Sequence, residues 1–173
     1  MKIIIQQGSG LDCSSLTELK IAESLKLDSN KIIFTSNYTS TEDLKYAFDM
    51  GVIINLDDYS LINKLYNIYN KFPEKIFFRL NPGIGNTDSV VKSNILGGPE
   101  AKFGISPENI IKCYKLSKKL GCKEYGIHMM TGSCILDNNY WSKSIKILID
   151  NIIKIENEVD IKIKYVNVGG GIG

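Results

Sequence analysis

Short apolar segments alternate along this chain with longer segments in which apolar residues recur every three or four positions. The short segments are rich in β-branched and aromatic residues and are predicted to be strands: 2–5, 31–35, 52–55, the segment from residue 77, 125–130 and 161–168. The longer segments are predicted to be helices: from residue 15, then 42–50, 59–69, 106–121 and 137–155. Because no hairpin signal interrupts this alternation, we expect parallel strands joined by right-handed crossovers.

Residues typical of helix ends mark several of these boundaries. Ser15 and Glu18 have the spacing of a capping box, and Ser106 followed by Pro107 is typical of a helix start. Gly51 and Gly121 follow the last apolar positions of their helices, where a left-handed residue usually ends the helix.

Two architectures satisfy this order of elements. A doubly wound sheet is complete with six strands, whereas a (β/α)₈ barrel needs eight strands and about 250 residues, so the length of 173 residues favours the sheet. The polar and glycine residues favour the barrel, because they follow predicted strands and the carboxyl ends of barrel strands meet on one face. They are Asp12, Ser36-Asn37, Asp57-Asp58, Arg79 to Asn81, His128 with Ser133, and Gly169 to Gly171. We therefore predict an α/β fold, a partial (β/α)₈ (TIM) barrel.

Composition narrows the function classes. A hydrophobic content of 43% over 173 residues predicts one domain with a core, and a net charge of +2 is too small to predict binding to nucleic acid or to a membrane. The apolar start of the chain is too short for a signal peptide, so we expect a cytoplasmic protein. The four cysteines form no CxxC pair and the chain has one histidine, so no metal site is expected.

The strand that begins at Phe77 leads into the most informative segment. Phe77, Arg79 and Asn81 share one face of this strand, and a cation beside core-facing residues needs an anionic partner. The strand stops at Asn81-Pro82-Gly83. The glycine-rich segment 83–104 is longer than a simple connection requires, which predicts a functional loop.

Four candidates have both a functional and a structural interpretation. Gly169 to Gly171 offer consecutive backbone N–H groups to a phosphate, but a plain tight turn or a dinucleotide fingerprint would have the same residues. His128 is either a general base or a core histidine held by a neighbour. Ser133 either donates to a phosphate or caps a turn, and Asp12 is either a site acid or the cap of the helix from Ser15.

Six segments form a pattern in order and with regular spacing: GSGLDCSSLTEL (8–19), FTSNY (34–38), FRLNPG (78–83), AKFGI (101–105), GIHMMTGS (126–133) and VGGGIG (168–173). Taken together they resemble the pyridoxal-phosphate decarboxylases of the alanine-racemase-like fold. The greatest similarity is to diaminopimelate decarboxylases and their ornithine and arginine relatives. The resemblance covers the whole chain and implies a barrel that binds pyridoxal 5'-phosphate and acts on a small amino-acid substrate in amino-acid metabolism, most simply diaminopimelate in lysine biosynthesis.

The resemblance also implies roles for individual residues. Ser133 and the amides of Gly169, Gly170 and Gly171 would hold the cofactor phosphate. Asp12 and Arg79 would lie near the cofactor ring, with Lys102 in the loop beside them. His128 belongs to the same motif. Met130 stands where many relatives have a histidine that stacks on the ring, and a thioether can pack there but cannot donate a proton.

Three expectations follow from where the resemblance stops. The lysine that holds the cofactor in relatives precedes the Gly8 region, so no Schiff-base lysine can be assigned and the isolated chain is expected to be inactive. The chain is expected to be one incomplete barrel domain, residues 1–173, with strands two to seven and without the C-terminal β-domain. Its open edges would favour aggregation, and the complete protein is expected to be a homodimer.

Other functions fit parts of the same pattern. A non-catalytic pseudo-decarboxylase or a cofactor-carrying barrel would keep the fold, and an ornithine- or lysine-type decarboxylase would differ in substrate. An amino-acid racemase shares the barrel, but the 83–104 loop and its KFGI end fit the decarboxylases better. A Rossmann-type nucleotide-binding protein would use Gly169 to Gly173 for a dinucleotide.

Overall fold

A computed structural model describes residues 1–84, 98 and 101–173 of the chain. Six parallel strands form one sheet, and each strand pairs with the next in the order β1-β2-β3-β4-β5-β6. Their bounds are β1 Leu11–Cys13, β2 Ile32–Thr35, β3 Ile53–Leu56, β4 Lys75–Leu80, β5 Glu124–Met129 and β6 Ile163–Asn167. A doubly wound sheet reverses its strand order at a switch point, and this sheet does not.

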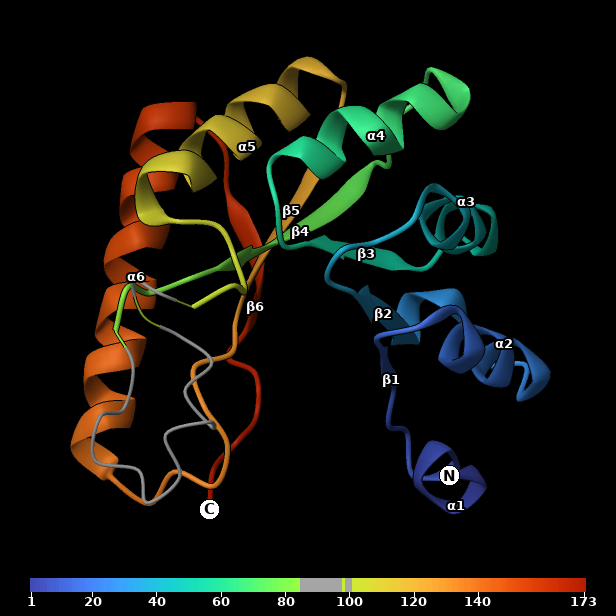
Figure 1. Ribbon diagram of the computed structural model, residues 1–173, viewed down its shortest axis with the longest axis horizontal. Coiled ribbons are helices and arrows are strands. Elements are labelled where there is room, and N and C mark those ends of the chain that lie inside the picture. The colour runs from blue at the N-terminus through green and yellow to red at the C-terminus, as the bar shows by residue number, and fades with distance from the viewer. Residues whose placement is uncertain (85–97, 99–100) are drawn as a thin grey trace.

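The helices confirm the barrel. They are α1 Lys2–Gln6, α2 Leu16–Ser24, α3 Thr41–Met50, α4 Ser60–Tyr69, α5 Pro107–Lys119 and α6 Asn138–Val159, with a short 3₁₀ turn at Ser29–Lys31. Each helix from α2 to α5 contacts the next one, and together α2 to α6 follow the outer side of the curved sheet (Figure 1). Helices on one side only, outside consecutive parallel strands, are the arrangement of a (β/α)₈ barrel. The alternative of a doubly wound sheet is therefore wrong.

The first strand lies later in the chain than predicted. Residues 2–5 were expected to form it, but they belong to helix α1, which buries none of its residues. The place beside β2 is taken by β1, where Leu11 pairs with Ile32 and Cys13 with Phe34. The chain can approach β2 this closely because Gly10 has no side chain, and a Cβ there would overlap the carbonyl group of Lys31. Backbone fit, rather than β-propensity, decides which segment pairs.

Several predicted helix ends are confirmed, whereas α6 continues to Val159, past its predicted end at residue 155. The Ser15 hydroxyl accepts a hydrogen bond from the Glu18 N–H at 3.3 Å, so Ser15 and not Asp12 caps α2. Gly51 ends α3 with φ of +67°, and Ser106 with Pro107 begins α5. The Asp137 carboxylate caps α6 by accepting from the Asn139 N–H at 2.8 Å.

The sheet has an apolar face and a polar face, because successive residues of a strand point to opposite sides. The side packed against the helices is fully apolar and includes Phe34, Ile54, Phe78 and Ile127, each at most 1% exposed. The strand pairings place a second set of residues together on the opposite, inner side: Asp12, Thr35, Asn55, Phe77, Arg79, Gly126, His128, Tyr165 and Asn167. The polar members of this set are the starting point for a functional site.

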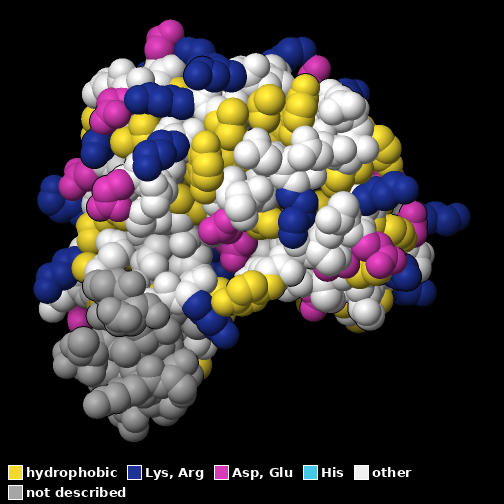
Figure 2. Space-filling view, turned by 45° about the horizontal axis from the view of Figure 1, so that its top comes forward, with side chains coloured by type: hydrophobic (Ala, Val, Ile, Leu, Met, Phe, Trp, Pro, Cys, Tyr) yellow, Lys and Arg dark blue, Asp and Glu magenta, His cyan; other side chains and the backbone are white. Residues whose placement is uncertain are grey.

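Aromatic side chains close the inner side toward the amino ends of the strands. The Phe77 ring fills the space beside Gly126, where a Cβ would overlap the ring atoms. Phe77 also stacks on Tyr165, with ring centroids 5.8 Å apart. The polar inner residues therefore lie above an aromatic floor, toward the carboxyl ends of the strands. On the outer surface, acidic and basic side chains are interspersed across the face seen in Figure 2.

Candidate functional site

A cavity of about 370 Å³ lies at the carboxyl ends of the strands, and we call it the strand-end cavity. It brings together six of the eight predicted site residues, although they are spread over most of the chain. The lining residues are Asp12, Ser14, Thr35, Asn37, Arg79, His128, Met130, Asn167, Gly169 and Gly170. The remaining two, Ser133 and Gly171, do not line this cavity.

Ser133 and Gly171 lie in two loops that pack against each other beside the cavity. The Ile135 N–H donates to the Gly171 carbonyl at 2.8 Å, and the Gly173 N–H donates to the Ile135 carbonyl at 3.1 Å. A Cβ on Gly171 would overlap the carbonyl oxygen of Gly132 and lie 3.2 Å from the Cα of Ser133. The loop after β5 and the loop after β6 therefore form one continuous wall at one end of the strand-end cavity.

The glycine loop after β6 has a backbone that only glycine adopts readily. Gly169 and Gly171 have φ of +73° and +90°, and the carbonyl of Met129 leaves no room for a Cβ on Gly169. The Asn167 side chain accepts from the Gly169 N–H at 2.8 Å, and the Gly170 N–H points at the Met130 sulfur, 3.2 Å away. Consecutive N–H groups in such a loop make a concave site for an anion.

Arg79 is buried between two acidic residues. Only 7% of its surface is exposed, and burial lowers its pKa while the charges of Asp57 and Asp12 raise it. Burial raises the pKa of both carboxyls, that of Asp57 to about 6, while the charge of Arg79 lowers them. In the described part of the chain no carboxylate oxygen lies within 4.0 Å of its guanidinium. The expected anionic partners of Arg79 are therefore Asp57 and Asp12. Their charges act on Arg79 from a distance, without a direct ion pair.

His128 is 5% exposed and is held by a neighbour that sequence reasoning did not assign. The Asn55 side-chain nitrogen lies 2.8 Å from the imidazole Nδ1, and the same nitrogen donates to the Thr35 hydroxyl at 3.1 Å. Burial, followed by the charge of Arg79, lowers the pKa of His128 to about 4. The only available signal was the position of Asn55 at the end of a predicted strand. His128 thus has features of both a site residue and a core histidine held by a neighbour, because it lines the cavity and is also fixed by the buried Asn55.

Between pH 4 and 6, His128 and Asp57 are expected to make opposite and nearly equal contributions to the pH dependence of the stability. The pKa of His128 is about 4 when folded and 6.5 ordinarily, so acidification through this window lowers the free energy of unfolding by about 3 kcal/mol. The pKa of Asp57 is about 6 when folded and 3.8 ordinarily, so acidification through that window raises the free energy of unfolding by about 3 kcal/mol.

Urea unfolding of two variants at pH 4.5 and 6.5 separates these effects. Relative to wild type, His128→Gln should gain stability at the lower pH, because it lacks the His128 effect. Relative to wild type, Asp57→Asn should lose stability there, because it lacks the Asp57 effect. Profiles of both variants that run parallel to the wild-type profile would contradict the two pKa values.

Lys102 lies outside the strand-end cavity. It lines a neighbouring cavity of about 450 Å³ with Asp57, Asp58 and Lys64, and Asn37 borders both cavities. The Lys102 ammonium lies 5.0 Å from the centre of the Phe103 ring, and the Arg79 guanidinium lies 5.0 Å from the same ring. The two cations therefore lie against the same aromatic ring. Most of the 83–104 loop, including Gly85 and Gly97, lies outside the described residues.

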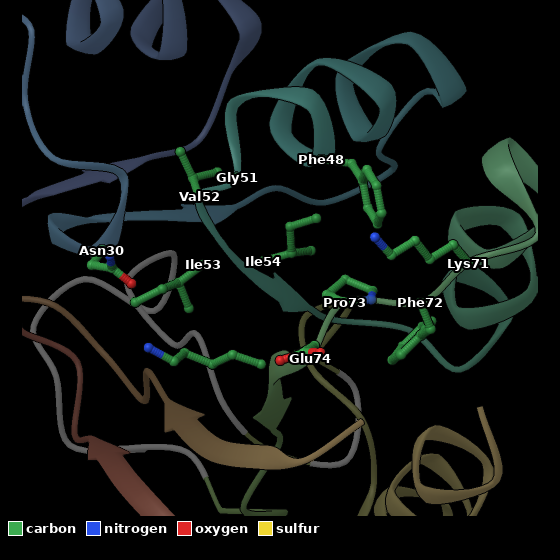
Figure 3. Close-up of a pocket in the computed structure, with 11 residues that line it drawn as sticks. Asn30, Phe48, Gly51, Val52, Ile53, Ile54, Lys71, Phe72, Pro73 and Glu74 are labelled. Carbon is green, nitrogen blue, oxygen red and sulfur yellow. The ribbon is translucent and has the colours of Figure 1, made fainter. Parts of the chain in front are cut away.

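A further cavity of about 310 Å³ lies at the opposite, amino ends of β3 and β4. Figure 3 shows Asn30, Phe48, Lys71 and Glu74 around it, together with backbone of the segments that lead into the two strands. It contains none of the predicted site residues. Barrel enzymes place their chemistry at the carboxyl ends of the strands, so the strand-end cavity is the candidate site.

In ranges 1–84 and 101–173, and at residue 98, no three or more His, Cys, Asp or Glu residues are grouped so that they could hold a metal ion. Within the same described part, no helix has the length and apolar content needed to cross a membrane.

Comparisons with known proteins place the chain. Residues 1–173 match the family model described as pyridoxal-dependent decarboxylase, pyridoxal binding domain. All of the chain aligns with Protein TabA of Pseudomonas amygdali pv. tabaci at 30% identity and with a diaminopimelate decarboxylase of Methanothermobacter thermautotrophicus at 31% identity, covering 40% of each relative. The chain thus spans about two fifths of the length of these relatives.

Solved structures show the same fold. Diaminopimelate decarboxylase from Helicobacter pylori, complexed with L-lysine, superposes with a TM-score of 0.89 at 22% identity, covering 99% of this chain and 44% of that one. Lysine decarboxylase from Selenomonas ruminantium superposes with a TM-score of 0.82 at 21% identity, covering 99% and 42%. With the family model matched from the first residue to the last, the chain belongs to the pyridoxal-dependent decarboxylases, in the part of them that binds pyridoxal.

Proposed function

We propose that this chain holds pyridoxal 5'-phosphate in the strand-end cavity and serves an amino-acid decarboxylase that acts on diaminopimelate. The observation that carries this proposal is the convergence of the two loops 131–133 and 169–171 into one wall beside a polar cavity of about 370 Å³. The family match supports the choice of cofactor.

The glycine wall fits the phosphate end of the cofactor. A Cβ on Gly169 or Gly171 would meet backbone, so the loop can keep its N–H groups at the surface only with glycine at these positions. The Gly170 N–H has the weak acceptor sulfur of Met130 as its partner, and a phosphate oxygen is a much stronger acceptor. The Ser133 hydroxyl, next to Gly171, would add a donor from the facing loop.

The opposite side of the cavity fits the ring end. Asp12, Arg79 and His128 lie on the inner face of three different strands. Met130, whose sulfur lies against the glycine loop, has a polarisable side chain that can pack on the face of a ring. When bound, the cofactor supplies an electron sink for the bond to the departing α-carboxylate. The protein's part is to orient the ligand above the aromatic floor and to keep the charge of Arg79 near it.

Diaminopimelate is proposed as the substrate because diaminopimelate decarboxylases are prominent among the relatives at about 30% identity. The alternative is an ornithine- or lysine-type decarboxylase, which shares the fold. We further propose that the six strands are the second to seventh of the barrel, and that the complete protein is a cytoplasmic homodimer.

Binding of the cofactor can be followed with the chain's single tryptophan. Trp141 lies at the start of α6 and donates to the Ile135 carbonyl at 3.3 Å, next to the glycine wall. Titration with pyridoxal 5'-phosphate should change its fluorescence at lower ligand concentration than titration with pyridoxal, because only the former carries the phosphate. Equal apparent affinities for the two ligands would contradict the proposal.

Replacing Ser133 tests the phosphate assignment. Ser133→Ala should weaken binding of pyridoxal 5'-phosphate by about ten- to a hundredfold, the effect of losing one hydrogen bond to a charged group, and should leave binding of pyridoxal unchanged. Ser142→Ala, at an exposed position of α6, is the matched control. Circular dichroism should show the same fold in all three chains. Unchanged affinity in Ser133→Ala would remove Ser133 from the site.

A further inference from the structure

We propose that Asn55 is a positioning residue that fixes the proton of the neutral His128 ring on Nε2, so that His128 presents an N–H donor to the strand-end cavity. The two residues come from β3 and β5, separated by β4 in the sheet. Their contact therefore spans the inner face of the barrel, and the register of three strands has to be correct for it to form.

The direction of the contact follows from what each group can donate. The nitrogen of the Asn55 amide lies 2.8 Å from Nδ1 of His128, and an amide nitrogen only donates. Nδ1 must therefore carry a lone pair. In a neutral imidazole one nitrogen donates and the other accepts, so the proton is on Nε2.

The orientation of the Asn55 amide is supported by its other contacts. Both of its N–H groups have partners, because the nitrogen also donates to the Thr35 hydroxyl at 3.1 Å. Its oxygen is buried and has no partner among the described residues. Turning the amide by 180° would leave two buried N–H groups without an acceptor in place of one carbonyl without a donor. Orphaned N–H groups are the rarer case in folded proteins.

The charged neighbours favour the neutral ring. Arg79 is the residue that pairs with His128 across β4 and β5, and its cation disfavours a second positive charge beside it. Asp12, on β1, lines the same cavity, and Asp57 follows β3 and acts on Arg79. His128 therefore lies beside the cation of Arg79, whose charge is offset by the carboxyls of Asp12 and Asp57.

A neutral Nε2–H is useful to a ligand in a specific way. It donates a hydrogen bond to an acceptor atom, and the ring stays neutral at neutral pH. This second step rests on the proposed function, since it concerns an acceptor on a bound cofactor or substrate. The tautomer itself does not depend on which ligand the cavity takes.

The chain is well suited to a direct measurement, because His128 is its only histidine. In protein labelled with ¹⁵N-histidine, two-bond ¹H–¹⁵N correlation spectra show which ring nitrogen carries the proton. At pH 7 we expect one imidazole with a protonated Nε2 and an unprotonated Nδ1. A protonated Nδ1 in the wild-type chain would overturn the inference.

A substitution of the same shape tests the role of Asn55. In Asn55→Asp the carboxylate can only accept, so Nδ1 of His128 should become protonated at pH 7. Asn63→Asp makes the same chemical change at an exposed position of α4 and should leave the wild-type tautomer intact. An unprotonated Nδ1 in Asn55→Asp would show that Asn55 does not set the tautomer and would overturn the inference.

Adding pyridoxal 5'-phosphate to the wild-type chain separates this inference from the proposed function. A shift of the Nε2 resonance on addition, with Nδ1 still unprotonated, supports both. Loss of the Nε2 proton on addition would overturn the donor role. If the ligand causes no change in the imidazole or in Trp141 fluorescence, the proposed function fails, while the Asn55-dependent tautomer measured without ligand still stands.

Discussion

Gly171→Ala is expected to weaken binding of pyridoxal 5'-phosphate by about tenfold or more. Gly171 has φ of +90°, a conformation that costs other residues about 1–2 kcal/mol, and a Cβ there would overlap the Gly132 carbonyl. The two loops would have to separate, which would disturb the hydrogen bond from Ile135 to Gly171. Binding would have to bring the separated loops back into the strained conformation, and since tenfold in affinity corresponds to about 1.4 kcal/mol, this cost is sufficient for the effect.

The neighbouring glycine is a matched control. A Cβ on Gly170 would meet nothing within 4 Å, and its φ is not positive, so Gly170→Ala adds the same methyl group to the same loop without a clash. Trp141 fluorescence titrations of both variants should show a large loss for Gly171→Ala and a small one for Gly170→Ala. Equal losses would mean that the conformation of Gly171 is not what shapes the site.

Arg79→Met is expected to lower the free energy of unfolding by about 2 kcal/mol at pH 7. Methionine keeps much of the side-chain volume but removes the one cation that, among the described residues, acts on the buried carboxyls Asp12 and Asp57. Attraction between charges several ångströms apart at an effective dielectric constant of about 20 amounts to roughly this energy. Without Arg79 the folded-state pKa of both carboxyls rises further above the ordinary value, so acidification reduces the stability deficit of the variant relative to wild type.

Urea unfolding of wild type and Arg79→Met at pH 4.5 and pH 7 measures this effect. The difference in stability should shrink at pH 4.5, where protonated carboxyls no longer need a cation. Adding Asp57→Asn to Arg79→Met should recover part of the stability at pH 7. Lys45→Met, at an exposed position of α3, controls for the loss of one positive charge. A deficit that is the same at both pH values would show that Arg79 acts through packing and not through charge.

The sequence was sufficient to predict much of the fold because two independent signals agree. The alternation of strand and helix predicts parallel strands, and the polar residues after the strands predict the face on which they meet. Arg79 was identified through its place on the same strand face as Phe77 and Asn81. It is also the only arginine in the chain, and the structure buries it to 7% exposure among the polar inner residues.

Other features depend on contacts that no local pattern contains. The isoleucines at 3–5 have high strand propensity, but pairing with β2 requires the close backbone approach that Gly10 permits. Asn55 has no local mark of function, because its partner His128 lies 73 residues further along the chain. Asp57 was noted only as a residue at a strand end, and its raised pKa comes from burial that depends on the finished fold.

Because the sheet has an apolar outer face and a polar inner face, core packing and the lining of the strand-end cavity depend on different residues. Neighbouring residues of one strand have different surroundings, since Phe78 packs against α5 while Arg79 lines the strand-end cavity. Substitutions at inner positions can therefore change the lining of the strand-end cavity with little loss of core packing, and outer positions can vary among apolar residues without altering that lining. A barrel built this way can acquire new substrates by small steps, which is consistent with one fold serving decarboxylases of several amino acids.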